Sequence, residues 1–114
     1  MAPLISICVP TYNGSPYLEP CLDAVLSQTT SDFEVLIVDD RSSDDSLHIA
    51  ERYARRDSRI MVSSNETNLG LVGNWNRCVQ VARLLGRDSK VELRRLAVPF
   101  ACLSHAPRIG SVLL

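Results

Sequence analysis

Three times over the first 83 residues, a short run of apolar residues is followed by a longer segment whose apolar residues recur every three or four positions. The short runs, at 4–9, 33–38 and 59–63, are rich in β-branched residues and have the character of strands buried within a sheet. Strands that alternate with helices pair in parallel through right-handed crossovers. The pattern therefore predicts an α/β fold, with a Rossmann-like parallel sheet built in the order β-α-β-α-β-α.

Start signals precede the first two helical segments. Ser15 followed by Pro16 is typical of an N-cap and a first helical residue. Ser42 with Asp45 three residues later resembles a capping box, and the helix that follows is expected to end near Arg56. The apolar stripes of the three predicted helices would face the sheet. Their residues are Leu18, Cys21, Leu22, Val25 and Leu26, then Leu47, Ala50, Tyr53 and Ala54, then Leu71, Trp75, Cys78, Val79 and Ala82.

Residues 84–114 differ from the rest of the chain. Arginine, leucine and alanine are frequent there, no helical or strand period dominates, and no helix cap is evident. We therefore expect two parts, namely an α/β unit over 1–83 and a divergent tail over 84–114 whose structure the sequence does not predict.

Charge and composition exclude several classes of protein. A formal net charge of −1 argues against a chain built to coat nucleic acid or an anionic membrane. No apolar run approaches the roughly 18 residues of a membrane span, and the first ten residues lack the basic start of a signal peptide. The four cysteines form no C-x-x-C pair, so we expect reduced, buried thiols rather than a zinc site or a disulfide framework. Reduced thiols are typical of a cytoplasmic protein.

Polar residues follow each predicted strand, at the sheet edge where open parallel sheets bind ligands. They lie at 10–13, 39–40 and 64–68. The strongest signal is Asp39-Asp40, because carboxylates beside a buried strand end must be solvated, paired or ligated. Alternation along the strand lets only one of them face the crevice, where it could bind a base or a ribose, while the other could cap the next helix. Alternatively, both acids only begin the turn into the second helix.

Four stretches, taken in order, resemble glycosyltransferase family 2. They are ICVPTYNG at 7–14, LDAVLSQT at 22–29, FEVLIVDDRSSD at 33–44 and NETNLG at 65–70, with Asn74 extending the last. The resemblance covers about residues 4–83. It implies the nucleotide-sugar-binding half of a GT-A fold. It also implies an enzyme that transfers a sugar with inversion from a nucleotide-diphosphate sugar to an acceptor, during polysaccharide or glycan synthesis.

The resemblance further implies nine nucleotide-binding residues in three groups, which line the base and ribose, bond the base, and shape the loop near the phosphates. These groups are Pro10, Thr11, Tyr12 and Asn13; Asp39 and Asp40; and Asn68, Gly70 and Asn74. Within the second group, Asp39 would bond the base and Asp40 would lie beside it. The donor would carry UDP, GDP or dTDP, and the acceptor would be a glycan or lipid-linked. The protein would work in the cytoplasm, or peripherally at the inner face of the membrane.

The sequence departs from the family's pattern after the third predicted helix. Family members continue into a fourth strand and a D-x-D motif that holds Mn²⁺ or Mg²⁺ against the diphosphate, and a later acid acts as the base. This chain contains no D-x-D motif, so it is expected to lack the metal site, and no catalytic residue is predicted. We expect the tail to arise from truncation or a shifted reading frame, with a genuine short variant as the alternative. Without a fourth strand, the strand at 4–9 would be an exposed apolar edge, which predicts poor solubility.

Three other interpretations compete with a glycosyltransferase. A nucleotide-binding protein without catalytic activity would share residues 1–83 and differ only through the tail. A phosphoacceptor receiver domain would explain VLIVDD at 35–40, but it leaves the strand at 4–9 unexplained. A dinucleotide-binding oxidoreductase would need G-x-G-x-x-G after the first strand, where this chain has PTYNG.

Overall fold

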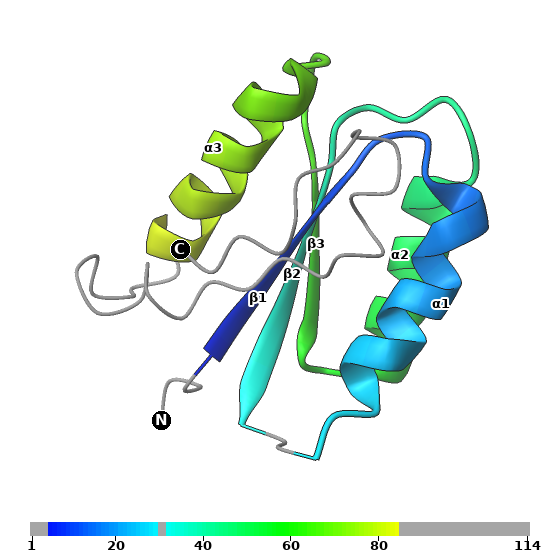
Figure 1. Cartoon of the computed structure of the whole chain (residues 1–114). Helices are drawn as coiled ribbons and strands as arrows, with labels where there is room; N and C mark the ends of the chain where they lie inside the picture. The colour runs from blue at the N-terminus through cyan, green and yellow to red at the C-terminus, as the bar shows by residue number, and fades with distance from the viewer. Residues whose placement is uncertain (1–4, 30–31, 85–114) are drawn as a thin grey trace.

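In the computed structural model, which describes residues 5–29 and 32–84, three strands alternate with three helices (Figure 1). The strands are β1 (Ile5–Thr11), β2 (Phe33–Asp39) and β3 (Ile60–Ser64), and the helices are α1 (Ser15–Leu26), α2 (Ser46–Arg56) and α3 (Gly70–Leu84). The α/β fold and the order of the elements confirm the sequence prediction. The tail predicted over 84–114 lies, apart from Leu84, outside the described residues.

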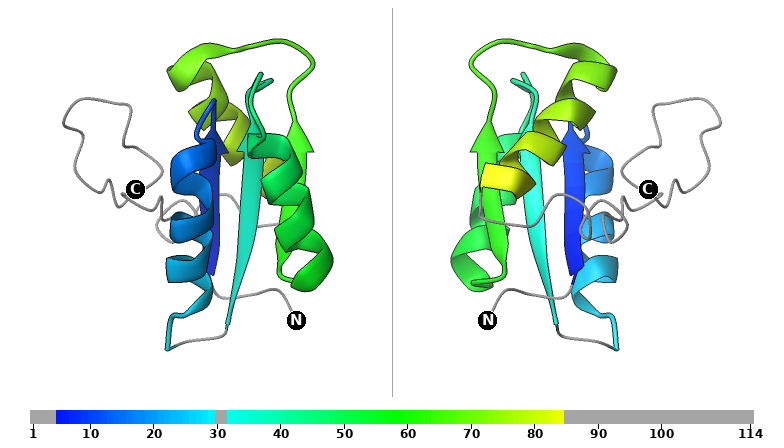
Figure 2. Two further views of the ribbon diagram at one scale, coloured as in Figure 1. Left: turned by 90° about the vertical axis from the view of Figure 1, so that its right-hand side faces the viewer. Right: turned by 90° about the vertical axis from the view of Figure 1, so that its left-hand side faces the viewer.

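The sheet has the order β1-β2-β3, and both pairs of neighbouring strands are parallel. The register places Thr11 opposite Asp39, and Asp39 opposite Ser64, so the three strands end at one edge. Figure 2 shows α1 and α2 on one face of the sheet and α3 on the other. The carboxyl edge therefore collects the loops that follow all three strands.

The two faces of the sheet carry cores of different size. The face under α1 and α2 holds the larger cluster, which includes the fully buried Leu22 and Ile37. The cluster under α3 is smaller and consists of Cys8, Leu36, Val38, Cys78 and Ala82. Strand β2 contributes to both clusters, and all seven of its residues are buried. This double burial is the physical reason for its nearly continuous apolar run.

The start of α1 lies one residue earlier than the sequence pattern predicts. Helix α1 begins at Ser15, its N-cap is Gly14, and Pro16 falls at the second helical position. The carbonyl of Gly14 accepts the first helical hydrogen bond from the N–H of Leu18 at 3.0 Å. Pro16 suits the first turn because the N–H that it lacks would have no intrahelical partner there.

The capping box predicted at the start of α2 does not form. Helix α2 begins at Ser46, its N-cap is Asp45, and Asp45 makes no side-chain cap hydrogen bond. Ser42 instead directs its N–H and its hydroxyl to the carboxylate of Asp39. A serine that follows an aspartate in this way closes a local turn, and that turn takes precedence over the cap.

The cysteines agree with the sequence prediction only in part. Cys8 and Cys78 are free and buried, whereas Cys21 is disulfide-bonded, so the prediction of reduced thiols is wrong for Cys21. The Cys8 thiol donates to the carbonyl of Cys78 at 3.8 Å. The Cys8 side chain also interacts with the Cys78 thiol, and this interaction together with burial raises the pKa of that thiol. Cys8 and Cys78 therefore act as small core side chains between β1 and α3. Cys102 lies outside the described residues.

Strand β1 is an edge strand within the described part of the chain, because it pairs with β2 alone. Its central residues, Cys8 and Val9, are nevertheless fully buried between the two helical layers. The poor solubility expected from an exposed strand edge stays a prediction. Among the described residues, no helix is long and apolar enough to cross a membrane.

Candidate ligand site at the carboxyl ends of the strands

Hydrogen bonds tie together the loops that follow β1 and β2. The N–H of Asp40 donates to the carbonyl of Thr11 at 2.8 Å and so extends the pairing of the two strands. The N–H of Asn13 donates to the Ser42 hydroxyl at 2.9 Å, and the side-chain oxygen of Asn13 accepts the N–H of Ser43 at 2.8 Å. Asn13 has a φ of 47°, a left-handed conformation that asparagine tolerates better than most residues. The two loops therefore form one cross-linked support.

The β2–α2 loop also holds the start of α1. The N–H of Gly14 donates to the Ser46 hydroxyl at 2.9 Å, and the N–H of Ser15 donates to Oδ2 of Asp44 at 3.1 Å. Oδ1 of Asp44 accepts the N–H of Ser46 at 2.9 Å. Burial raises the pKa of Asp44, but the hydrogen bonds from Ser46 and Ser15 outweigh burial and leave the pKa below its usual value. A charged Asp44 thus joins the N-terminal ends of α1 and α2, where negative charge is favourable.

Asp39 alternates with Ile37 along β2, so its side chain leaves the sheet on the face that α1 and α2 cover. Only 1% of its surface is exposed. Oδ1 accepts the Ser42 hydroxyl at 2.6 Å, and Oδ2 accepts the Ser42 N–H at 2.9 Å. Since a carboxylate oxygen can accept two hydrogen bonds, each oxygen of Asp39 keeps an acceptor position beyond these bonds. Asp39 therefore combines a fixed orientation with spare acceptor capacity.

Asp40 is also 1% exposed, but its partners lie in the β3–α3 loop and at the start of α3. Oδ1 accepts the side-chain amide of Asn65 at 2.9 Å and the N–H of Leu69 at 2.7 Å, while Oδ2 accepts the N–H of Gly70 at 3.0 Å. The Asp40 carbonyl accepts the side-chain amide of Asn68 at 3.0 Å. Asp40 thus caps α3, a helix that begins far along the chain, rather than the next helix α2.

Two buried side-chain amides extend this connection. The amide of Asn65 also donates to Oδ1 of Asn74 at 2.9 Å, and the amide of Asn74 donates to the carbonyl of Val38 at 3.0 Å. Asn65 and Asn74 are 8% and 3% exposed, so these bonds replace the water that both amides lose on folding. Together with Asp40, the amides hold β2, the β3–α3 loop and α3 in one arrangement.

The structure brings all nine predicted nucleotide-binding residues to the carboxyl edge, but they differ in accessibility. Those with exposed surface are Tyr12, with 54% exposed, and Asn13, Asn68 and Gly70. Those that are buried are Pro10, Thr11, Asp39, Asp40 and Asn74. The side chains of Asp40 and Asn74 form hydrogen bonds with other parts of the chain.

Three residues of this edge, Ser42, Asn65 and Arg41, have structural roles that the sequence reasoning did not assign. Ser42 could have been recognised, because a serine shortly after an aspartate often closes a turn on its carboxylate. Asn65 and Arg41 carry no such local signal, since their partners are distant in sequence. Asn65 binds Asp40, and Arg41 donates to the carbonyl of Glu66.

The described residues do not fit a divalent metal. The oxygens of Asp39 and Asp40 accept hydrogen bonds from N–H and O–H donors, whereas Mn²⁺ or Mg²⁺ needs several oxygen ligands directed at one point. Within 5–29 and 32–84, no group of three or more His, Cys, Asp or Glu side chains could hold a metal ion.

Comparison with known sequences finds similarity to one family of glycosyltransferases. The sequence profile of Glycosyl transferase family 2 matches residues 6–84. The uncharacterized glycosyltransferase EpsJ of Bacillus subtilis (strain 168) is 47% identical over 83 residues, which cover 73% of this chain and 24% of EpsJ. The uncharacterized protein MT1568 of Mycobacterium tuberculosis (strain CDC 1551 / Oshkosh) is 46% identical over 118 residues, which cover 93% of this chain and 36% of MT1568.

The extent of these two matches matters in two ways. The chain spans about a quarter of EpsJ and about a third of MT1568. A match that covers 93% of the chain must also extend into residues 84–114. The origin of residues 84–114 in truncation or a shifted reading frame stays a prediction.

Two solved structures share the fold. Staphylococcus aureus TarS 1–349 in complex with UDP-GlcNAc superimposes with a TM-score of 0.61 at 36% identity, over 68% of this chain and 23% of TarS. The mannosyltransferase PcManGT from Pyrobaculum calidifontis, in complex with GDP-Man and Mn²⁺, superimposes with a TM-score of 0.62 at 25% identity, over 71% of this chain and 25% of the enzyme.

Proposed function

The chain belongs to glycosyltransferase family 2, and we propose that the carboxyl edge of its sheet binds the nucleotide of a nucleotide-diphosphate sugar. A family 2 enzyme transfers the sugar of such a donor to an acceptor, here a glycan or a lipid-linked molecule. The observation that carries the proposal is Asp39, a carboxylate that Ser42 orients and that keeps acceptor capacity, at the strand edge from which the chain continues into the exposed Tyr12.

The sugar donors bound by the two structural neighbours indicate which bases the site could accept. TarS was solved with UDP-GlcNAc and the mannosyltransferase with GDP-Man. Uracil and guanine both present a ring N–H beside a carbonyl oxygen, so both can donate a hydrogen bond to a carboxylate. We assign the carboxylate of Asp39 to this ring N–H and the ring of Tyr12 to the face of the base.

Contact with Asp39 requires a small change at the edge, because only 1% of its surface is exposed. The base N–H would then take one of the acceptor positions that the two bonds from Ser42 leave on Asp39.

The other predicted residues divide by accessibility. Those with exposed surface are proposed to contact the ribose or the phosphates directly, namely Asn13, Asn68 and Gly70. Those that are buried are proposed to shape the site without touching the ligand, namely Pro10, Thr11, Asp40 and Asn74. The buried residues would then affect nucleotide affinity indirectly, because they hold the loops that carry the contacting residues.

Sugar transfer needs more than donor binding. A divalent metal, when bound in such enzymes, stabilises the diphosphate that leaves the sugar. Since the described residues do not fit a metal, we assign them to donor binding alone. We also propose that the transfer inverts the configuration at the sugar carbon. The protein would act in the cytoplasm, either in solution or at the inner face of the membrane.

Isothermal titration calorimetry of the 114-residue chain with UDP, GDP, dTDP, CDP and ADP tests the proposal. We expect at least one of UDP, GDP and dTDP to bind, and CDP and ADP to bind at least about 10-fold more weakly, because their bases lack the ring N–H. Binding should be similar with and without Mn²⁺. A chain that binds none of the five nucleotides would contradict the proposal.

A nucleotide-binding protein without catalytic activity is the second candidate. The observation that favours it is that the described residues contain no cluster of acids suited to a metal. Incubation of the chain with UDP-GlcNAc and Mn²⁺ separates the two candidates. Release of UDP at a rate above that without protein supports a transferase, whereas UDP binding without any release supports the second candidate.

A further inference from the structure

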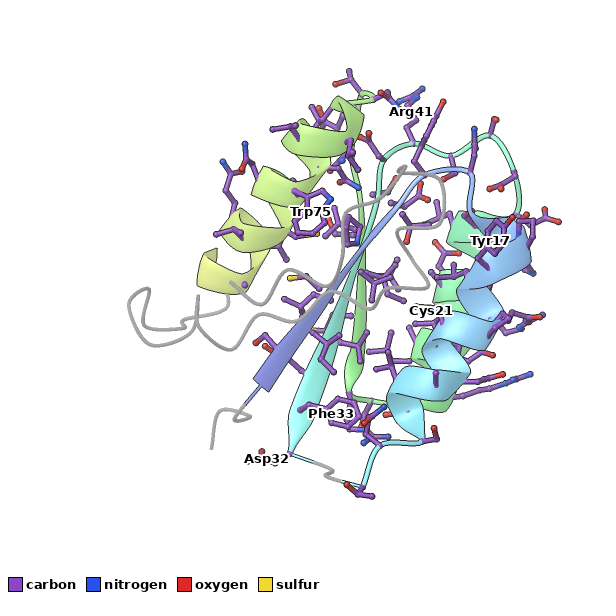
Figure 3. All side chains as sticks on the ribbon, in the orientation of Figure 1. Tyr17, Cys21, Asp32, Phe33, Arg41 and Trp75 are labelled. Carbon is purple, nitrogen blue, oxygen red and sulfur yellow. The ribbon has the colours of Figure 1, made fainter. Side chains whose placement is uncertain are left out.

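Arg41 adopts an unusual backbone conformation at the ligand edge. Its φ is 59°, in the left-handed region that residues other than glycine rarely occupy. Figure 3 shows Arg41 beyond the carboxyl ends of the strands, at the opposite end of the sheet from Asp32 and Phe33. Strained conformations of this kind gather at sites that bind ligands. The left-handed backbone of Arg41 therefore suits a residue with a role in ligand binding.

The guanidinium of Arg41 is oriented by a backbone carbonyl. Its Nη1 donates to the carbonyl of Glu66, which ties the β2–α2 loop to the β3–α3 loop. A guanidinium has five N–H donors, so this contact leaves most of them for other acceptors. The ion pairs found among the described residues involve Arg52 and Arg59, and neither includes Arg41. Within the described part of the chain, this exposed guanidinium is thus held by Glu66 and has donors beyond that bond.

We propose that Arg41 is a specificity-determining residue that donates a hydrogen bond to a ring carbonyl oxygen of the nucleotide base. This inference rests on the proposed function, in which Asp39 accepts the ring N–H of the base. Asp39 and Arg41 are separated by a single residue, so the segment that follows β2 carries both an acceptor and a charged donor. An N–H with a carbonyl oxygen next to it on one edge of a base complements this pair.

The pairing predicts which bases are accepted. Uracil, thymine and guanine each present a ring N–H beside a carbonyl oxygen. Cytosine and adenine instead present an unprotonated ring nitrogen beside an amino group. The ring nitrogen is an acceptor and would face the acceptor Asp39, while the amino group is a donor and would face the donor Arg41. The same two residues therefore attract one class of base and reject the other.

A carbonyl oxygen of the base is a suitable partner for the guanidinium of Arg41, because a guanidinium only donates hydrogen bonds. A hydrogen bond from a charged donor to a neutral carbonyl is also stronger than one between neutral groups.

The test compares the wild-type chain with Arg41→Gly and with a control, Arg77→Ala. Glycine adopts a φ near 59° without strain, so Arg41→Gly is expected to keep the fold and the melting temperature. Arg77 lies on α3, and its guanidinium binds Gln80, so its removal takes away a cation outside the site. Calorimetric titration with UDP and with CDP gives the affinities. If GDP binds more tightly than UDP, GDP and ADP replace them.

We expect Arg41→Gly to weaken UDP binding about 10-fold and to leave CDP binding unchanged or stronger. Arg77→Ala should change neither. Equal affinity of Arg41→Gly and wild type for UDP would overturn the assignment of Arg41 while leaving the proposed function intact. Equal weakening of UDP and CDP would also overturn it, because the lost contact would then be with the diphosphate that both share. A wild type that binds no nucleoside diphosphate would overturn the proposed function and this inference together.

Discussion

The carboxyl edge of the sheet has two sides that are built differently, although each is centred on one of two neighbouring aspartates. On the first side, Asp39 binds Ser42, three residues along the chain, and keeps acceptor positions free. On the second side, Asp40 binds the β3–α3 loop and the start of α3, which lie 25 to 30 residues away. We call these the turn side and the helix side.

The difference follows from the geometry of a strand end. Successive side chains leave a strand on opposite faces, so Asp39 and Asp40 meet different helices although both are buried. Local partners leave the turn side adaptable, whereas distant partners make the helix side a structural joint. The comparison leads us to expect that substitutions on the helix side reduce stability, and that substitutions on the turn side reduce ligand binding.

The largest effect is expected from Asp40→Ala. The substitution removes the acceptor of the Leu69 N–H, and one of two acceptors of the Gly70 N–H and of the Asn65 amide. We expect a loss of about 3 kcal/mol in the free energy of unfolding, which would lower the melting temperature by about 10 °C or more. Thermal and urea unfolding followed by circular dichroism would measure it.

The matched control for Asp40→Ala is Asp45→Ala. Asp45 is exposed and makes no side-chain cap hydrogen bond, so its loss should cost less than about 1 kcal/mol. Similar destabilisation by the two variants would show that Asp40 does not join β2 to α3 as described.

A smaller loss of stability is expected from Asn74→Ala. This substitution removes the hydrogen bond to the Val38 carbonyl and one partner of Asn65, which should cost about 2 kcal/mol. A double-mutant cycle with Asn65→Ala should give a coupling energy of at least about 0.5 kcal/mol, because the two amides bind each other. Strictly additive effects would mean that the amides act independently and that the helix side is not one unit.

The smallest effect concerns the acid stability of the loop at the start of α1. Because the pKa of Asp44 is lowered in the folded chain, its charged form stabilises the fold above the ordinary pKa near 3.8. That contribution is lost as the pH falls below 3.8 and through the lowered pKa. Asp44→Asn should therefore cost about 1 kcal/mol at pH 7 and progressively less at low pH. A destabilisation that is independent of pH would contradict a charged Asp44.

The order of strands and helices could be predicted because it depends on local periodicity. The runs around Leu36 and the stripe that contains Leu22 repeat within a few residues, and burial against a sheet explains both. The location of the candidate site was also predictable, since parallel strands must end at a common edge. The role of Asp39 as the base-binding carboxylate stays a prediction.

The connections across this edge could not be read from the sequence. The cap that Asp40 provides for α3 joins residues 30 positions apart, and only the folded sheet brings them together. The turn made by Ser42 competed with a capping box of equally plausible spacing. The left-handed conformation of Arg41 has no signature, because glycine, asparagine and aspartate are the residues that normally mark it.

The measurement that tests the account most directly is nucleotide affinity and melting temperature for Asp39→Asn. An asparagine can still bind the N–H and hydroxyl of Ser42, so the melting temperature should fall by no more than about 3 °C. The lost charge should weaken binding of UDP or GDP about 10-fold or more. Unchanged affinity, or a loss of stability as large as that of Asp40→Ala, would contradict the distinction between the turn side and the helix side.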